Sequence, residues 1–168
     1  GLFAGQLTES AIESVEIEYV GEVGELNFSP LTSATIAGLL SPLLSQVNMV
    51  SAPALARERG ITVSEVRRAS SGAFDSYIRL SVKTERQQRS VAGTVFSDGK
   101  PRVIQVKGIN MEAELAPRVL YVTNLDQPGF IGALGSVLGE HGINIASFNL
   151  GREKPGGDAI SLVSIDNC

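Results

Sequence analysis

The stretch that decides the fold of the second half of the chain is NLDQPG, residues 124–129. An apolar strand pattern over 118–124 leads into it, and an amphipathic helix pattern over 128–141 follows. Two further strand patterns, 143–150 and 159–165, come after the helix and are joined by a turn. The order β-α-β-β predicts a ferredoxin-like unit that lacks its last helix and strand.

The same stretch predicts a ligand site at the start of the helix. Pro128 can begin the helix, whose free amides suit a carboxylate, and Gly129 lets a ligand approach the backbone. Asp126 can accept a hydrogen bond from an ammonium group, while Asn124 and Asn144 each offer a donor and an acceptor. These five residues predict a pocket for a small zwitterion, and they do not predict catalysis.

A structural alternative explains the same residues. Asp126 or Gln127 would cap the helix, and Asn144 would shape the turn after Gly142. Spacing alone slightly favours this alternative. His141, in the last turn of the helix, is expected to interact with the helix dipole and not to act as a catalytic base.

The first half of the chain combines strand and helix patterns. Residues 14–23 alternate between apolar and polar side chains, which predicts a strand with one exposed face. Ser29-Pro30 signals a helix start, and Pro42 should kink or divide that helix. Ser51-Ala52-Pro53 signals a shorter helix that ends at Gly60.

A period of two residues returns from Ile61 onward and is clearest over 78–83. Strands 90–96 and 102–107 follow, and the SDGK sequence between them predicts a hairpin. These patterns predict an α+β fold, with a helical layer on an antiparallel sheet. We place this domain at 8–115 and the ferredoxin-like domain at 116–168, with 1–7 as a preceding helix or linker.

Composition limits the partners. The net charge of −4 and the pI near 5.0 argue against nucleic acid or an anionic membrane as a partner. No apolar run reaches the roughly 18 residues that a membrane-spanning helix needs. The one cysteine, Cys168, suits a reducing cytoplasm, and with one histidine in the chain no zinc or Cys-His catalytic site is expected.

A second binding site is conceivable on the last predicted hairpin of the first domain. Lys100, Arg102 and Lys107 follow one another along it and can form an anion site. Solvated charges on an edge strand explain them equally well.

Two groups of motifs resemble a known family. Residues 120–129 with GINIA at 142–146 resemble an ACT domain, the amino-acid-sensing module. NFSPL at 27–31, VNMVSAP at 47–53 and ARERGI at 56–61 resemble the intervening, allosteric-substrate-binding domain of long bacterial D-3-phosphoglycerate dehydrogenases. The resemblance covers nearly the whole chain.

The resemblance implies a regulatory role without catalysis. In that family ACT domains pair between subunits and bind L-serine, which by position would contact Asn124, Asp126 and Asn144. The catalytic residues and NAD belong to other domains of the parent enzyme, which oxidises 3-phosphoglycerate in the first step of serine biosynthesis. We therefore expect no catalytic residue and no cofactor here. The bare edge of a shortened ACT sheet should favour self-association.

Other classes of protein would also contain these motifs. Iron–sulfur L-serine dehydratases carry a related pair of domains, and a stand-alone amino-acid sensor would need only the ACT part. An RNA-binding ferredoxin-like domain would need exposed strand aromatics and basic charge, which the sequence lacks. Of the basic cluster that holds a phosphorylated ligand in some relatives, only Arg102 clearly matches.

Overall fold

The computed structural model describes residues 1–70 and 72–166, and the chain divides into two compact units, Gly1–Thr94 and Val95–Cys168. The first unit contains four helical segments and four strands. In chain order they are α1 (Leu2–Gln6), β1 (Ile12–Gly21), the 3-10 helix η1 (Glu22–Glu25), α2 (Ser29–Leu40), α3 (Ala52–Glu58), β2 (Thr62–Arg68), β3 (Ser76–Thr84) and β4 (Gln88–Val95).

The strands of the first unit lie in the order β2-β1-β3-β4. β1 pairs antiparallel with β3, and β3 with β4, as expected. β2 differs, because it pairs in parallel with β1. The prediction of a purely antiparallel sheet is therefore wrong at this edge. The reason is the connection: α2 and α3 carry the chain across the sheet, and such a crossover returns the next strand in the same direction.

The predicted helices of the first unit are confirmed, but the first is shorter than predicted, because no helix continues beyond Pro42 up to residue 50. α2 ends at Leu40, two residues before Pro42, whose missing N–H and fixed φ oppose a longer helix. α3 stops at Glu58, and Gly60 has the positive φ of 72° that favours glycine after a helix. Ser29 lies inside α2, and the N-cap position is Phe28.

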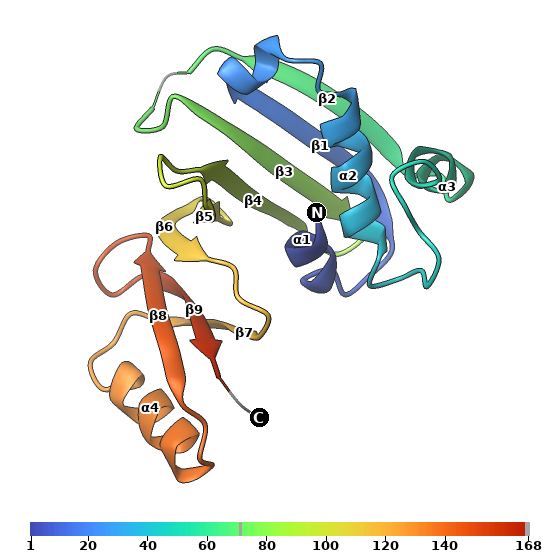
Figure 1. Ribbon diagram of the computed structural model, residues 1–168. Helices are drawn as coiled ribbons and strands as arrows, with labels where there is room; N and C mark the ends of the chain where they lie inside the picture. The colour runs from blue at the N-terminus through green and yellow to red at the C-terminus, as the bar shows by residue number, and fades with distance from the viewer. Residues whose placement is uncertain (71, 167–168) are drawn as a thin grey trace. The chain divides into compact units, whose positions relative to one another are not determined.

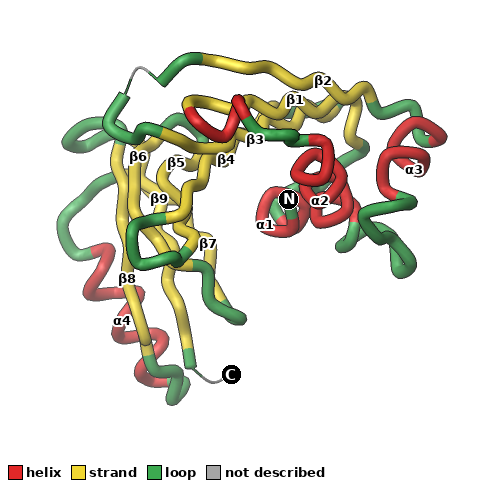
Figure 2. The backbone as a smooth tube through the Cα atoms, turned by 45° about the horizontal axis from the view of Figure 1, so that its top comes forward, coloured by secondary structure: helices red, strands yellow, loops and turns green. Residues whose placement is uncertain are grey.

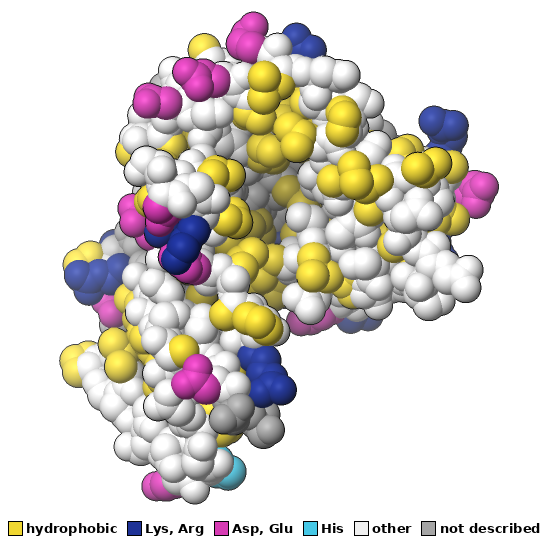
Figure 3. All heavy atoms as spheres, viewed as in Figure 1, with side chains coloured by type: hydrophobic (Ala, Val, Ile, Leu, Met, Phe, Trp, Pro, Cys, Tyr) yellow, Lys and Arg dark blue, Asp and Glu magenta, His cyan; other side chains and the backbone are white. Residues whose placement is uncertain are grey.

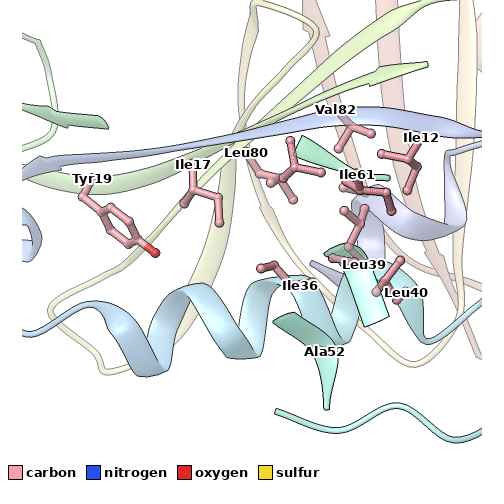
Figure 4. Close-up of a cluster of buried hydrophobic side chains, with 13 residues drawn as sticks. Ile12, Ile17, Tyr19, Ile36, Leu39, Leu40, Ala52, Ile61, Leu80 and Val82 are labelled. Carbon is pink, nitrogen blue, oxygen red and sulfur yellow. The ribbon is translucent and has the colours of Figure 1, made fainter. Parts of the chain in front are cut away.

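The helices cover one face of the sheet and bury one continuous core (Figures 1 and 2). Ile17, Tyr19 and Leu39 are completely buried in it, and Figure 4 shows them between β1, β3 and α2. The Tyr19 hydroxyl lies 2.7 Å from Thr32 Oγ1, and Thr32 in turn hydrogen-bonds Glu65. The buried hydroxyl is thus paired, as a core position requires.

The described residues of the second unit form five strands and one helix. They are β5 (Pro101–Val106), β6 (Ile109–Glu114), β7 (Val119–Leu125), α4 (Phe130–Glu140), β8 (Ile145–Arg152) and β9 (Asp158–Ile165). β5 and β6 form an antiparallel hairpin. β7, β9 and β8 form an antiparallel sheet with β9 in the centre. The order β7-α4-β8-β9 confirms the predicted ferredoxin-like arrangement.

α4 packs on one face of the three-stranded sheet, where Leu138 contacts a cluster that includes Val163 and Ile165 (Figure 1). The helix begins at Phe130 and not at Pro128 as predicted. Gly129, at φ 91°, has a left-handed conformation that cannot be part of an α-helix. Pro128 and Gly129 therefore form the turn before the helix.

β6 packs closely against β8. Gly151 of β8 is buried, and a Cβ atom there would lie 2.4 Å from the carbonyl oxygen of Asn110. Only glycine permits this approach of two backbones. The β5–β6 hairpin is thereby held against the sheet of the second unit.

No helix in the described part of the chain is long and apolar enough to cross a membrane. Among residues 1–70 and 72–166, no three histidine, cysteine or acidic side chains gather as metal ligands would. Cys168, on which the expectation of a reducing compartment rests, lies outside the described residues.

Candidate ligand site

Asn124 lies at the end of β7, on the face of the sheet that carries α4. It follows Leu120 by four residues, and Leu120 packs in the α4 cluster, so alternation places both side chains on that face. Its Nδ2 donates to the carbonyl oxygen of Leu125 at 2.6 Å. Its Oδ1 is buried and accepts no hydrogen bond from the described residues. A buried acceptor without a donor costs about 1–3 kcal/mol, which a ligand could recover.

Asp126 is held by the turn between β8 and β9. Its Oδ2 accepts hydrogen bonds from Arg152 Nη1 at 2.7 Å and from the Gly156 amide at 3.2 Å. The hydrogen bond from Arg152, followed by that from Gly156, lowers the pKa of the Asp126 carboxyl. Asp126 is therefore charged and already has a cationic partner within the chain.

The N-terminus of α4 has no side-chain cap. No side-chain hydrogen bond reaches its first turn from the described residues, so neither Asp126 nor Gln127 caps the helix. The free amides that follow Gly129 carry the positive end of the helix dipole and suit a carboxylate group. The structure therefore contradicts the alternative in which Asp126 or Gln127 caps the helix.

Asn144 lies at the other end of the sheet. Its Nδ2 donates to the Asp166 carboxylate, and its carbonyl oxygen accepts from the Asp166 amide at 3.1 Å. Asn124 pairs with Ala159, whereas Ile145, next to Asn144, pairs with Ile165. Ala159 and Ile165 are six positions apart along β9, or about 20 Å at about 3.3 Å per residue. One chain therefore does not bring Asn144 to the other four predicted site residues.

The three cations of the predicted anion site do not come together, because Lys107 lies apart from Lys100 and Arg102. Arg102 Nη2 lies 2.6 Å from an oxygen of Asp98 and 3.1 Å from one of Glu114, and Lys100 Nζ is 3.6 Å from the same Glu114 oxygen. Lys107 lies at the opposite end of the hairpin, in the turn between β5 and β6. Lys100 and Arg102 are thus balanced by carboxylates, and Lys107 is separate from them.

The single histidine is exposed at the end of α4 (Figure 3). His141 Nδ1 lies 2.8 Å from the Val137 carbonyl oxygen, one turn earlier. This position agrees with the structural role expected for it. On the face shown in Figure 3, basic side chains are dispersed among acidic ones.

A cavity of about 680 Å³ was not predicted from the sequence. It is lined by the β5–β6 turn (107–109), the end of β7 (123–125), the start of β9 (158–160) and Glu153. Thr123 and Leu125 alternate with Asn124, so their side chains face away from α4. The cavity is therefore on the opposite face of the sheet from the Asn124 side chain. The sequence indicates the turn at this cavity by Lys107-Gly108, which lies between two stretches of alternating apolar and polar residues.

The fold and these groups define a two-part α+β protein whose second part is a ferredoxin-like unit with a buried, unpaired amide oxygen and an uncapped helix N-terminus. Residues 1–107 match the model of the D-3-phosphoglycerate dehydrogenase intervening domain, and residues 118–167 match the ACT domain model. The chain belongs to the D-3-phosphoglycerate dehydrogenase family.

Relatives named D-3-phosphoglycerate dehydrogenase align over nearly the whole chain. The protein of Bacillus subtilis is 33% identical over 167 residues, which cover 99% of this chain and 32% of the relative. That of Synechocystis is 35% identical over 169 residues, or 99% and 30% of the two chains. That of Methanocaldococcus jannaschii is 31% identical over 163 residues, or 96% and 31%. The chain thus spans about a third of these relatives' length.

The two family matches leave residues 108–117 between them, whereas the compact units divide earlier, after Thr94. The domain boundary at residues 115–116 stays a prediction.

Proposed function

We propose that this chain senses L-serine and regulates the D-3-phosphoglycerate dehydrogenase of which it is part. The observation that carries the proposal is the unpaired Oδ1 of Asn124 on the strand that leads to the uncapped N-terminus of α4. The amide oxygen suits an ammonium group, and the helix amides suit a carboxylate. L-serine, the end product of the pathway, has both.

The proposed site needs two copies of the chain. Asn144 lies about 20 Å from Asn124 along β9, so it can complete the site only from a second molecule. In a two-fold symmetric pair each ACT unit would give Asn124 and the start of α4 to one site, and Asn144 to the other. Self-association through ACT units with open sheet edges is therefore part of the proposal, and serine would strengthen it.

Catalysis is assigned to the remainder of the parent enzyme. The chain contains no G-x-G-x-x-G fingerprint, and none of its residues is proposed to hold NAD. Serine bound between two ACT units would alter how the parent's domains are arranged, and substrate would in turn alter serine affinity. The proposal places the enzyme in the cytoplasm, in keeping with a chain that has one cysteine.

Calorimetry tests the serine site directly. L-serine should bind the chain saturably, and Asn144→Ala should weaken binding at least about tenfold, which corresponds to about 1.4 kcal/mol. Asn149→Ala is the matched control, because Asn149 is on β8, the strand that directly follows Asn144, and its side-chain amide bonds only Ser147 among the described residues. Undiminished serine binding by Asn144→Ala would refute the site.

A further inference from the structure

The cavity on the face of the second unit's sheet away from α4 has the size of a small-molecule site. Its volume of about 680 Å³ falls in the range of about 300–1,000 Å³ that such sites occupy. All its lining residues belong to the second unit. Asn124 is one of the lining residues, but strand alternation directs its side chain to the other face of the sheet, where the proposed serine site lies.

Lys107 has an unusual backbone at this cavity. Within residues 1–70 and 72–166 it is the one residue other than glycine with a positive φ, at 50°. With Gly108, at φ 80°, it forms the two-residue turn between the paired residues Val106 and Ile109. Such turns favour Asn-Gly or Asp-Gly, and a left-handed lysine costs about 1 kcal/mol or more. Residues held in such conformations are concentrated at binding sites.

The charge of Lys107 has no partner within the described chain. No carboxylate of those residues lies within 4.0 Å of its ammonium group. This contrasts with Lys100 and Arg102 at the other end of the same hairpin, which both contact Glu114. A cation that lies in a left-handed turn at a cavity and forms no ion pair with a described residue suits the carboxylate of a ligand.

Two carboxylates line the same cavity. Glu153 and Asp158 close the turn between β8 and β9, where the Glu153 amide donates to the Asp158 carbonyl oxygen at 2.9 Å. Neither side chain forms an ion pair with a described residue. They can receive an ammonium group, so the cavity offers both charges that a zwitterion needs.

The rest of the lining is partly apolar. Ile109 and Ile160 are buried there, and Leu125 is 54% exposed although it is a large hydrophobic residue. The cavity also exceeds what a ligand as small as serine would fill. We propose that it is a second site, which binds a free α-amino acid with an apolar side chain. The Lys107 ammonium pairs with the ligand carboxylate, and Asp158 and Glu153 pair with its ammonium.

Nuclear magnetic resonance on the 15N-labelled 168-residue chain tests this site with matched probes. L-leucine has both charges, 4-methylpentanoate lacks the ammonium group, and 3-methylbutylamine lacks the carboxylate. L-leucine should shift the amide signals of Lys107, Gly108 and Asp158 saturably, and both analogues should bind at least about tenfold more weakly. Equal binding of the three probes, or no shift of these signals, would overturn the proposal.

Lys107→Asn provides the matched variant. Asparagine tolerates the left-handed conformation, so the turn should keep its stability while the charge is lost. Leucine binding should fall at least tenfold with the thermal midpoint unchanged or higher. Asn144→Ala should leave leucine binding intact, which separates this site from the serine site. Undiminished leucine binding by both Lys107→Asn and Asp158→Asn would refute the second site, irrespective of the result of the serine-binding experiment.

Discussion

The two units treat their polar groups differently. In the first, Glu18 is only 5% exposed, yet it pairs with Arg68 at 2.6 Å and Arg79 at 2.7 Å across three adjacent strands. In the second, Lys107 lines a cavity and forms no ion pair with a described residue, and the Asn124 Oδ1 is buried without a donor among the described residues. The buried Glu18 thus joins three strands of the first unit, whereas Lys107 and the Asn124 Oδ1 of the second unit have no such partner among the described residues.

The two units also differ in how completely they bury their apolar side chains. The first unit has three helices over one face of its sheet and a continuous core beneath them. The second has one helix, whose Ile131 and Val137 are more than half exposed, and a small cluster around Leu138 and Val163. Stability should therefore be most sensitive to the first unit, and ligand binding to the second.

The largest expected effect is on the core of the first unit. Leu39→Ala removes a completely buried side chain and should lower the free energy of unfolding by about 2–5 kcal/mol. Val50→Ala, at a side chain that is 91% exposed, is the control and should change it by less than about 0.5 kcal/mol. Denaturant titration followed by circular dichroism measures both. Equal effects would contradict the assignment of the core.

A smaller effect is expected where β6 meets β8. Gly151→Ala would put a methyl group 2.4 Å from the Asn110 carbonyl oxygen, so the strands must separate at a cost of about 1–3 kcal/mol. Gly135→Ala is the matched control in α4, because its added Cβ meets nothing within 4 Å. The control should be stabilised by up to about 1 kcal/mol, since alanine favours helix. If the unfolding midpoint of Gly151→Ala rose like that of Gly135→Ala, the close contact between β6 and β8 would be contradicted.

The smallest expected effect on stability concerns Glu18. Burial raises the pKa of this carboxyl, but hydrogen bonds from Arg79 and Arg68 outweigh burial and hold the pKa below its ordinary value of 4.5. The folded pKa is lower than the unfolded one, so the stabilisation is present above pH 4.5 and is lost as the pH falls through the folded pKa. Glu18→Gln should cost about 1–2 kcal/mol at pH 7, a modest value because Arg68 is 60% exposed.

Unfolding experiments between pH 7 and pH 3 test this prediction. The difference between wild type and Glu18→Gln should shrink as the pH falls below 4.5, since the protonated carboxyl then resembles the amide. A difference that stays constant down to pH 3 would show that the ion pairs do not stabilise the fold.

The elements that the sequence predicts well are those set by local chemistry. Pro42 ends α2 and Gly60 follows α3 because each residue limits its own backbone. The turn at Asp98-Gly99 is confirmed by the Phe96–Lys100 backbone hydrogen bond at 3.0 Å. The strand pattern of β6 was present in the alternation of Ile109, Met111 and Ala113 but was missed, because the two-residue turn before it contains lysine in place of asparagine.

The features that the sequence did not predict depend on contacts between distant residues. The parallel pairing of β2 is set by the path of two helices, which no single segment specifies. The two asparagines, Asn124 and Asn144, were predicted to lie close together because their side chains have the same chemistry. Their actual positions are set by the register of β7 and β8 against β9, which places them far apart within one chain. The cavity at Lys107 is formed by four segments that are apart in the sequence, so no local sequence pattern predicts it.

The most direct test of the account is a complementation experiment on the proposed serine site. Asn124→Ala and Asn144→Ala chains should each lose serine binding. Mixed in equal amounts, they should regain about a quarter of the wild-type capacity, because about half of the pairs are mixed and each mixed pair has one intact site of two. Calorimetric titration of the mixture with L-serine measures this capacity. Mixing without recovery would contradict the central claim that two chains share each serine site, with Asn124 from one chain and Asn144 from the other.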